Sequence, residues 1–146
     1  MSRDPAFFSH KSNSAGLNYE LAISVFSNQL VWMSGPHPAG RSDIQVFRQE
    51  DGLKDKIPAG KKLIADNGYR GERSIISTPN SQDPQPVRKL KGRARSRHEA
   101  FNGKIKNFSA LAEPFRHGIN KHKIAFEAIC IIVQYQLENG SPLFDV

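Results

Sequence analysis

RARSRHEAFNGKIK, residues 93–106, decides how the C-terminal half of this chain folds. The stretch opens a series of apolar residues at steps of four, three, four and three, formed by Phe101, Ile105, Phe108, Ala112 and Phe115. These steps follow the period of one face of an α-helix. The stretch therefore predicts an amphipathic helix, which Pro114 is expected to end or kink.

Glu99 is the only acidic residue in this stretch, among five arginines and lysines. One explanation is local, because Ser96 and Glu99 have the S-x-x-E spacing of a capping box, in which the glutamate bonds back to the start of the helix. The other explanation is a metal ligand in a site that acts on phosphate. On a helix, Glu99 lies roughly 160° from Phe101, so it can face away from the apolar stripe. The residues alone leave both explanations open.

The N-terminal half has the pattern of strands. Residues 19–26, YELAISVF, place Tyr19, Leu21 and Ile23 on one face, and LVWM at 30–33 follows a short polar break. This arrangement predicts two antiparallel strands joined by a tight turn. GPHPAG at 35–40 is expected to end the second strand, because proline cannot donate a hydrogen bond to a neighbouring strand.

The middle of the chain predicts a short helix and then a buried strand. Ser42–Gln45 has the S-x-x-Q spacing of a capping box, from which a helix is expected to continue toward Gly52 or Lys56. KLIAD, residues 62–66, is a compact apolar run that ends at Asn67–Gly68, a pair typical of an exposed turn.

One more strand, a loop and a last helix complete the predicted order. Residues 74–78 have the composition of a strand, and residues 79–92 begin with the proline-rich PNSQDPQP, which predicts a loop. A helix is expected over residues 121–137, with Asn139–Gly140 as its stop signal. The sequence of elements predicts one α/β domain over residues 1–146 with its helices late in the chain.

Composition limits the classes of function. The 146 residues have a formal net charge of +7, which favours polyanionic partners. The single cysteine, Cys130, has no partner for a disulfide or a zinc site, and its apolar run is too short to cross a bilayer. The N-terminal sequence lacks the apolar region of a signal peptide, so we expect an intracellular location without membrane association. Within the cell, the nucleus is the expected location, although basic residues alone do not identify a nuclear signal.

Asp66 is the second acid of interest, since it follows a buried strand, at the edge where α/β sheets gather ligands. An ordinary Asp-Asn-Gly turn explains it equally well. If Asp66 and Glu99 act together, their oxygens suit a hard divalent cation such as Mg²⁺ or Mn²⁺, which can activate water and stabilise a leaving oxygen at a phosphodiester.

Several strings resemble the DDE superfamily endonuclease domain of Harbinger-like transposases. They are AGLNYELAISVFSNQLVWMSGPHPAGRSD at 15–43, IADNGYRG at 64–71 and ARSRHEAFNGKIKNFSAL at 94–111, followed by FRH and KHKIAFEAICIIVQ. Two motifs, one around Asp66 and one around Glu99, fall in the family's order and at its spacing. The resemblance covers nearly the whole chain.

The resemblance implies a ribonuclease-H-like mixed sheet flanked by helices, with three acids that bind divalent metal for cleavage of DNA. Asp66 resembles the second acid and Glu99 the third, His98 and Asn102 have supporting roles, and Asp43 is interpreted as structural. The family's first acid lies on a strand that has no counterpart here. We therefore expect the first strand and first acid to be missing, in a fragment or relic with impaired activity.

The basic run is expected to contact DNA phosphates. It consists of Arg88, Lys89, Lys91, Arg93, Arg95, Arg97, Lys104 and Lys106. The sequence has no evident helix-turn-helix or zinc finger, so the family resemblance suggests a separate DNA-binding protein as partner. The alternative to a nuclease is a non-catalytic DNA-binding or interaction protein derived from a transposase.

Overall fold

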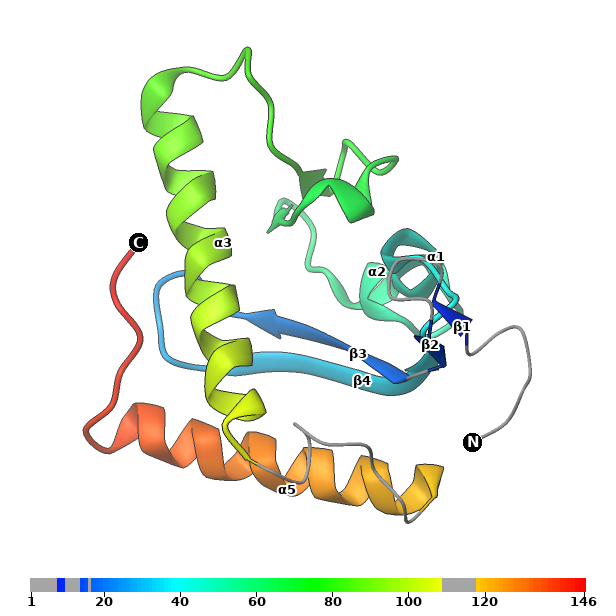
Figure 1. Cartoon of the computed structure of the whole chain (residues 1–146). Helices are drawn as coiled ribbons and strands as arrows, with labels where there is room; N and C mark the ends of the chain where they lie inside the picture. Colours follow the sequence, from blue (N-terminus) through cyan, green and yellow to red (C-terminus); the bar gives the residue numbers. More distant parts are fainter. Residues whose placement is uncertain (1–7, 10–13, 16, 109–117) are drawn as a thin grey trace.

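The computed structural model describes residues 8–9, 14–15, 17–108 and 118–146 (Figure 1). Strands dominate the first half and two long helices the second. The strands are β1 (Phe8–Ser9), β2 (Ser14–Ala15), β3 (Leu17–Ile23), β4 (Leu30–Pro38), β5 (Leu63–Ile64) and β6 (Ile76–Ser77). The helices are α1 (Asp43–Arg48), α2 (Leu53–Lys56), η2 (Asn67–Tyr69), α3 (Gln85–Lys106) and α5 (Ile119–Glu138).

The β3–β4 hairpin is the largest strand pair, and it is antiparallel as predicted. Its second strand is longer than expected, because β4 continues through the prolines to Pro38. The prediction that GPHPAG ends this strand was therefore wrong. Among the described strands β4 pairs with β3 alone, so its prolines lie on an edge strand, where a missing donor costs little. Gly35, at φ 133°, lets the Tyr19 ring pack closely against the backbone.

The described strands form three separate two-stranded sheets. β1–β2 and β3–β4 are antiparallel, while β5–β6 is parallel and pairs Leu63 with Ile76. Both predicted strands of the middle region are present but only two residues long. The α/β class is therefore confirmed, whereas the single ribonuclease-H-like sheet is not seen in the described residues.

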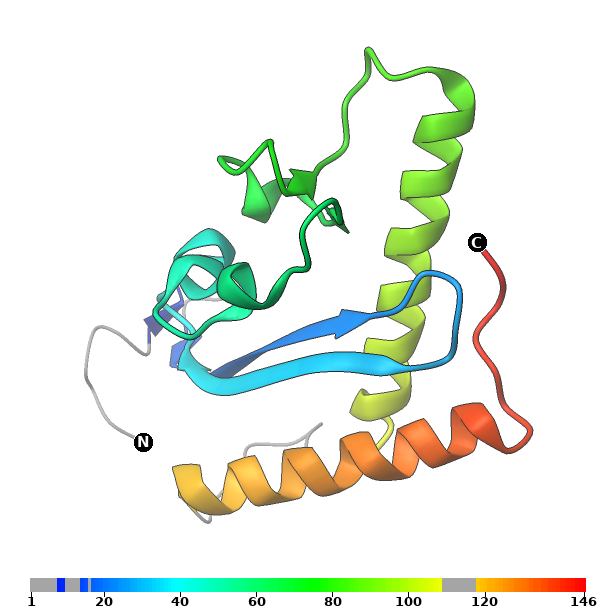
Figure 2. The same cartoon turned by 180° about the vertical axis from the view of Figure 1, so that it is seen from behind.

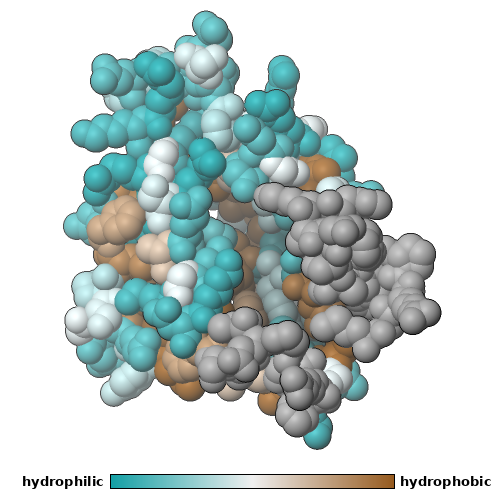
Figure 3. Space-filling model, viewed as in Figure 1, coloured by the Kyte–Doolittle hydropathy of each residue, from teal (hydrophilic) through white to brown (hydrophobic). Residues whose placement is uncertain are grey.

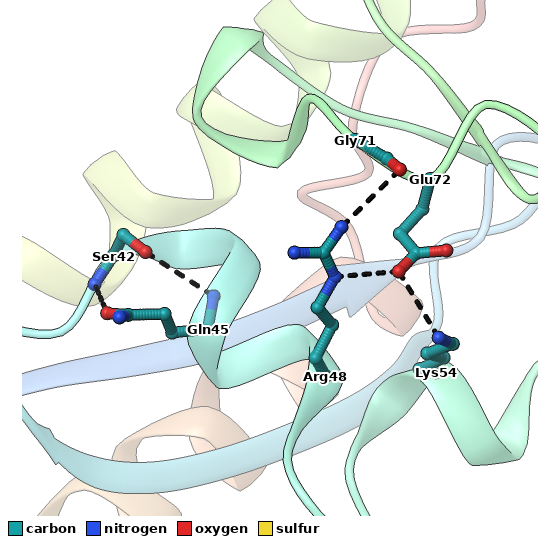
Figure 4. A network of polar contacts seen from close by, with 6 residues as sticks. All are labelled: Ser42, Gln45, Arg48, Lys54, Gly71 and Glu72. Carbon is teal, nitrogen blue, oxygen red and sulfur yellow. Dashed lines mark hydrogen bonds and ion pairs between the residues drawn. The ribbon is translucent and has the colours of Figure 1, made fainter.

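The capping box of α1 is confirmed. Ser42 Oγ accepts a hydrogen bond from the backbone N–H of Gln45, and the backbone N–H of Ser42 donates to Gln45 Oε1 at 2.9 Å (Figure 4). The predicted helix is split into α1 and α2, since Asp51 adopts a left-handed conformation at φ 54° between them.

An ion-pair network holds α1, α2 and the segment after η2 together (Figure 4). The Glu72 carboxylate accepts from Arg48 Nε at 2.6 Å and from Lys54 Nζ at 3.2 Å. Arg48 also donates to the carbonyl of Gly71 at 3.4 Å. The two cations hold the pKa of Glu72 below its ordinary value.

Helix α3 begins at Gln85, so the loop expected over 79–92 ends earlier than predicted. Pro84 is the N-cap residue and Pro86 lies in the first turn, where proline is compatible with a helix. Ser96 is consequently in the helix interior. The capping-box interpretation of Ser96 and Glu99 was therefore wrong, and Glu99 needs another explanation.

Helices α3 and α5 meet beside the hairpin (Figures 1 and 2). One core cluster joins Phe101 and Ile105 of α3 to Phe126, Val133 and Leu137 of α5. The predicted apolar stripe is confirmed for Phe101 and Ile105, while Phe108 follows the helix and is half-buried. Ala112, Pro114 and Phe115 lie outside the described residues.

Tyr19 fastens the hairpin to α5. Its ring stacks on Phe126 with 3.6 Å between centroids, and its hydroxyl lies 2.6 Å from His122 Nδ1. The last helix and its stop at Asn139–Gly140 are confirmed, with Gly140 at φ 119°. Cys130 is buried in α5 with a free thiol.

A second core cluster lies on the other side of the hairpin. Ala22 of β3 packs there with Phe47 of α1, Leu53 of α2 and Ile76 of β6, and Trp32 of β4 is half-buried against them. The hairpin thus contributes side chains to both clusters. No helix in the described part of the chain has the length and apolarity needed to span a membrane.

Candidate active site

Asp66 and Glu99 line the same cavity, which has a volume of about 580 Å³. The cavity lies between the hairpin, the segment around β5 and helix α3. Its polar wall includes a third carboxylate, Asp43, together with His98 and Asn102. Residues that are far apart in the sequence therefore line one partly open cavity.

Asp66 is held by the turn that follows β5. It is the N-cap of η2, and its Oδ1 accepts a hydrogen bond from the N–H of Gly68 at 3.0 Å. The turn interpretation of Asp66 is thus confirmed, and the turn holds the carboxylate at the edge of the cavity.

Asp43 lies beside Asp66. A Cβ atom added to Gly68 would be 3.2 Å from Asp66 Oδ1 and still closer to Asp43 Oδ2, so both carboxylates flank this glycine. Asp43 is the first residue of α1, immediately after the Ser42 cap. Its position beside Asp66 depends on how α1 packs against η2, which the sequence pattern does not encode.

Glu99 faces the cavity from the interior of α3, while Phe101 and Ile105 on the opposite side of the helix lie in the core with α5. The expected separation of roughly 160° between Glu99 and the apolar stripe accounts for this arrangement. Packing against α5 therefore directs Glu99 toward the hairpin and η2.

His98 joins α3 to the hairpin next to Glu99. Its Nε2 lies 2.9 Å from the carbonyl oxygen of Leu21 in β3, and its Nδ1 lies 3.3 Å from Asn102 Nδ2. Both contacts are hydrogen bonds when the ring proton is on Nε2. His98 and Asn102 thus support the position of Glu99.

Sequence reasoning missed Glu20, a carboxylate on β3 that is only 4% exposed. Glu20 accepts hydrogen bonds from Trp32 Nε1 at 3.0 Å and from the Tyr69 hydroxyl at 3.3 Å. Burial raises the pKa of Glu20, its two donors offset part of the rise, and the Asp43 carboxylate adds to it. Glu20 therefore ties η2, and with it Asp66, to the hairpin. The strand pattern gave no sign of this role, because an alternating strand places glutamate on its polar face.

The sequence model of the DDE superfamily endonuclease family matches residues 1–134. The chain belongs to this family. The matched range includes the hairpin, both predicted acids and most of α5. Comparisons with curated proteins and with solved structures find no match.

The donors in this DDE superfamily endonuclease are of the type that divalent metals prefer. Asp43, Asp66 and Glu99 place carboxylate oxygens on the cavity wall, and such oxygens suit Mg²⁺ or Mn²⁺. Within the described residues, however, no three acidic, histidine or cysteine side chains stand close enough together to form a metal-binding group. The chemistry of the donors fits a divalent metal.

Two of the predicted phosphate-binding residues of this endonuclease point inward. Arg97 is 3% exposed and donates to the carbonyl oxygens of Ser24, Ser27 and Phe144. Lys91 pairs with the Asp83 carboxylate and donates to the carbonyl of Thr78 at 3.0 Å. Both cations hold the protein together and are not displayed to solvent.

The other basic residues of the predicted run lie at the surface of α3, which is largely hydrophilic in Figure 3. They are Arg88, Lys89, Arg93, Arg95, Lys104 and Lys106. Arg95 lines the cavity, and so do Lys61 and Lys62 on the β5 side. Sequence reasoning missed these two lysines, because they lie outside the basic run. The cavity of this endonuclease therefore combines three carboxylates with three surface cations.

Proposed function

We propose that this chain is the nuclease domain of a Harbinger-like transposase and that it acts on DNA phosphodiesters with Mg²⁺ or Mn²⁺. The observation that carries this proposal is the presence of Asp66 and Glu99 on one cavity, within a chain that belongs to the DDE superfamily endonucleases. A ribonuclease-H-like arrangement of the whole domain belongs to the same proposal.

Asp66 and Glu99 are the residues that hold the metal in this proposal, with Asp43 beside them. A bound divalent ion would activate a water or hydroxyl and stabilise the leaving oxygen. His98 and Asn102 keep Glu99 directed at the cavity, and Glu20 keeps η2 in place through Tyr69. Weak metal binding and low activity for this chain alone belong to the same proposal.

Arg95, Lys61 and Lys62 would hold the DNA backbone at the mouth of the cavity. They come from both sides of it, so a phosphate between them meets positive charge from two directions. Selection of the target sequence is assigned to a separate DNA-binding protein. A nuclear location belongs to this proposal, and a fluorescent fusion tests it.

Nicking of supercoiled plasmid DNA in the presence of Mn²⁺ tests the nuclease proposal. We expect activity in the unaltered chain and its loss in Asp66→Asn and in Glu99→Gln. Asp43→Asn tests whether the neighbouring carboxylate contributes. The control is Glu50→Gln, an acid that does not line the cavity. Equal nicking by the Asp66 and Glu99 variants would remove the site assignment.

A non-catalytic DNA-binding protein is the second candidate, supported by the exposed cations of α3. Here DNA affinity should fall steeply with salt and persist in Asp66→Asn. Replacing Arg95, Lys61 and Lys62 by alanine should weaken binding and lower the salt slope by about one for each phosphate that the protein no longer neutralises. Lys56→Ala, which changes an exposed lysine outside the cavity, serves as control. Unchanged DNA affinity in the triple variant would show that DNA does not bind at the cavity.

A further inference from the structure

Helix α5 has apolar residues on two opposite faces. One face, which includes Phe126, Ile129, Val133 and Leu137, is buried in the core. The opposite face carries a stripe at steps of four, three and four residues, formed by Ile124, Ala128, Ile131 and Tyr135. We call this stripe the outer stripe.

The outer stripe is open to solvent. Ile124 is 66% exposed, Ile131 71% and Tyr135 67%. Ile132, on its flank, is 44% exposed. Apolar surface is visible along α5 in Figure 3. The stripe does not line the cavity, so the proposed nuclease site does not account for it.

Polar and charged residues border the outer stripe. Lys121 and Lys123 lie near its N-terminal end, Glu127 and Gln134 along its side, and Glu138 at its C-terminal end. A contiguous apolar patch with a polar rim is typical of a protein–protein interface, whereas isolated exposed apolar residues are ordinary.

We propose that the outer stripe binds the outer stripe of a second copy of this chain, with the two α5 helices antiparallel. Charge favours this direction, because it brings Lys121 of one helix near Glu138 of the other, while Lys123 pairs with Glu127 of its own helix. A parallel pair would bring the lysines of both copies together. Antiparallel helix dipoles attract each other as well.

The order of side chains along the stripe also suits an antiparallel pair. When the sequence is reversed about the middle of the stripe, Ile124 meets Tyr135 of the second copy and Ala128 meets Ile131. A small residue then faces a large one at the centre, which allows close packing of the two helices. Each copy uses the same surface, as a two-fold symmetric dimer requires.

The dimer is expected to be weak. The outer stripe extends over about 17 Å of helix, at a rise of about 1.5 Å per residue. An interface built from one such stripe is at the small end of specific interfaces. A dissociation constant of about micromolar or higher is therefore expected.

Sedimentation equilibrium over a range of protein concentrations tests the association. We expect a monomer–dimer equilibrium in the unaltered chain and a dissociation constant raised about tenfold or more in Ile131→Glu. Phe26→Glu is the control, because Phe26 is 87% exposed in the hairpin turn and lies outside both the stripe and the cavity. Circular dichroism checks that both variants are folded. A chain that stays monomeric at millimolar concentration, or equal effects of the two substitutions, would overturn the proposal.

Disulfide cross-linking tests the direction of the pair. When Ile124→Cys and Tyr135→Cys proteins are mixed and oxidised, an antiparallel pair predicts that the cross-link between the two variants forms in preference. Cross-links within each variant alone would indicate parallel helices and contradict the proposed arrangement. Cys130 is only 2% exposed, so the native thiol does not interfere.

Discussion

Arg97 and Glu99 are two positions apart on α3, yet they have opposite roles. Both line the cavity, but Arg97 is buried and donates to the carbonyl oxygens of the hairpin turn and of Phe144, whereas Glu99 is exposed. Both belong to the basic stretch, and only their directions on the helix distinguish them. Net charge along the sequence therefore does not identify which arginines are exposed.

Arg97→Ala is expected to lower the free energy of unfolding by about 2–4 kcal/mol, because several buried carbonyl oxygens lose their donor. Arg95→Ala, at the cavity surface, should change it by no more than about 0.5 kcal/mol. Urea titrations followed by circular dichroism measure both. If the two variants are equally stable, Arg97 has no structural role.

Glu20 predicts a pH dependence of stability. Its pKa is raised in the folded protein, so ionisation of the buried carboxyl opposes folding above the ordinary glutamate pKa. Glu20→Gln retains an acceptor for Trp32 and removes the charge. We therefore expect Glu20→Gln to be more stable than the unaltered chain at pH 7 and to lose this advantage as the pH falls toward 4.5.

Urea unfolding at a series of pH values tests this prediction. Glu72→Gln gives the opposite comparison, because the pKa of Glu72 is lowered by Arg48 and Lys54. The ion pairs of Glu72 stabilise the fold above the ordinary glutamate pKa, and this contribution disappears as the pH falls below it. The same direction of change in both variants would contradict the assignment.

The elements that sequence could predict are those fixed by local chemistry. The Ser42–Gln45 capping box and the stop at Asn139–Gly140 each depend on a few neighbouring residues, and both are present. The start of α3 was misplaced because Ser96–Glu99 has the same local pattern without being a cap. The extent of β4 was underestimated because tolerance of proline depends on whether a strand is at an edge.

The candidate site was predictable only where neighbouring residues in the sequence determine it. Asp66 and Glu99 were found through motifs, and the helical period gave the direction of Glu99. Glu20, Lys61 and Lys62 were missed, because their positions follow from packing between elements that are distant in the sequence. Burial of Glu20 in particular depends on Trp32 and Tyr69, which come from two other elements.

Glycine-to-alanine substitutions distinguish positions with space for a side chain from positions without it. Gly92 is inside α3, and an added Cβ would meet nothing within 4 Å, so Gly92→Ala should stabilise the protein by about 0.5–1 kcal/mol. Gly68→Ala should destabilise it, because the added methyl group would press against the carboxylates of Asp43 and Asp66. Thermal unfolding of the two variants compares them directly. A stabilised Gly68→Ala protein would contradict the close approach of these acids.

The whole molecule is built from two core clusters that share the β3–β4 hairpin. Tyr19, Leu21 and Ile23 pack toward α5, while Ala22 packs toward α1 and α2, since successive side chains of a strand point to opposite faces. Because one hairpin serves both clusters, we expect them to unfold together.

Ile76→Val and Ile105→Val test this coupling, one in each cluster, at positions that are both 4% exposed. Each should lower the free energy of unfolding by about 0.5–1.5 kcal/mol. Fluorescence of Trp32, the only tryptophan, reports on the second cluster, while circular dichroism reports mainly on α3 and α5. The two signals should shift together in both variants. Separate transitions would show two independent units.

Phe101 and Ile105 also have a consequence for any chemistry at the cavity. They fix the rotation of α3 about its own axis, since a rotation of one residue would remove both side chains from the hydrophobic core. The direction of the Glu99 side chain is thus determined by hydrophobic contacts on the opposite face of the helix. In the proposed nuclease, selection for faster DNA cleavage should therefore recover substitutions at these two positions, although they lie outside the cavity.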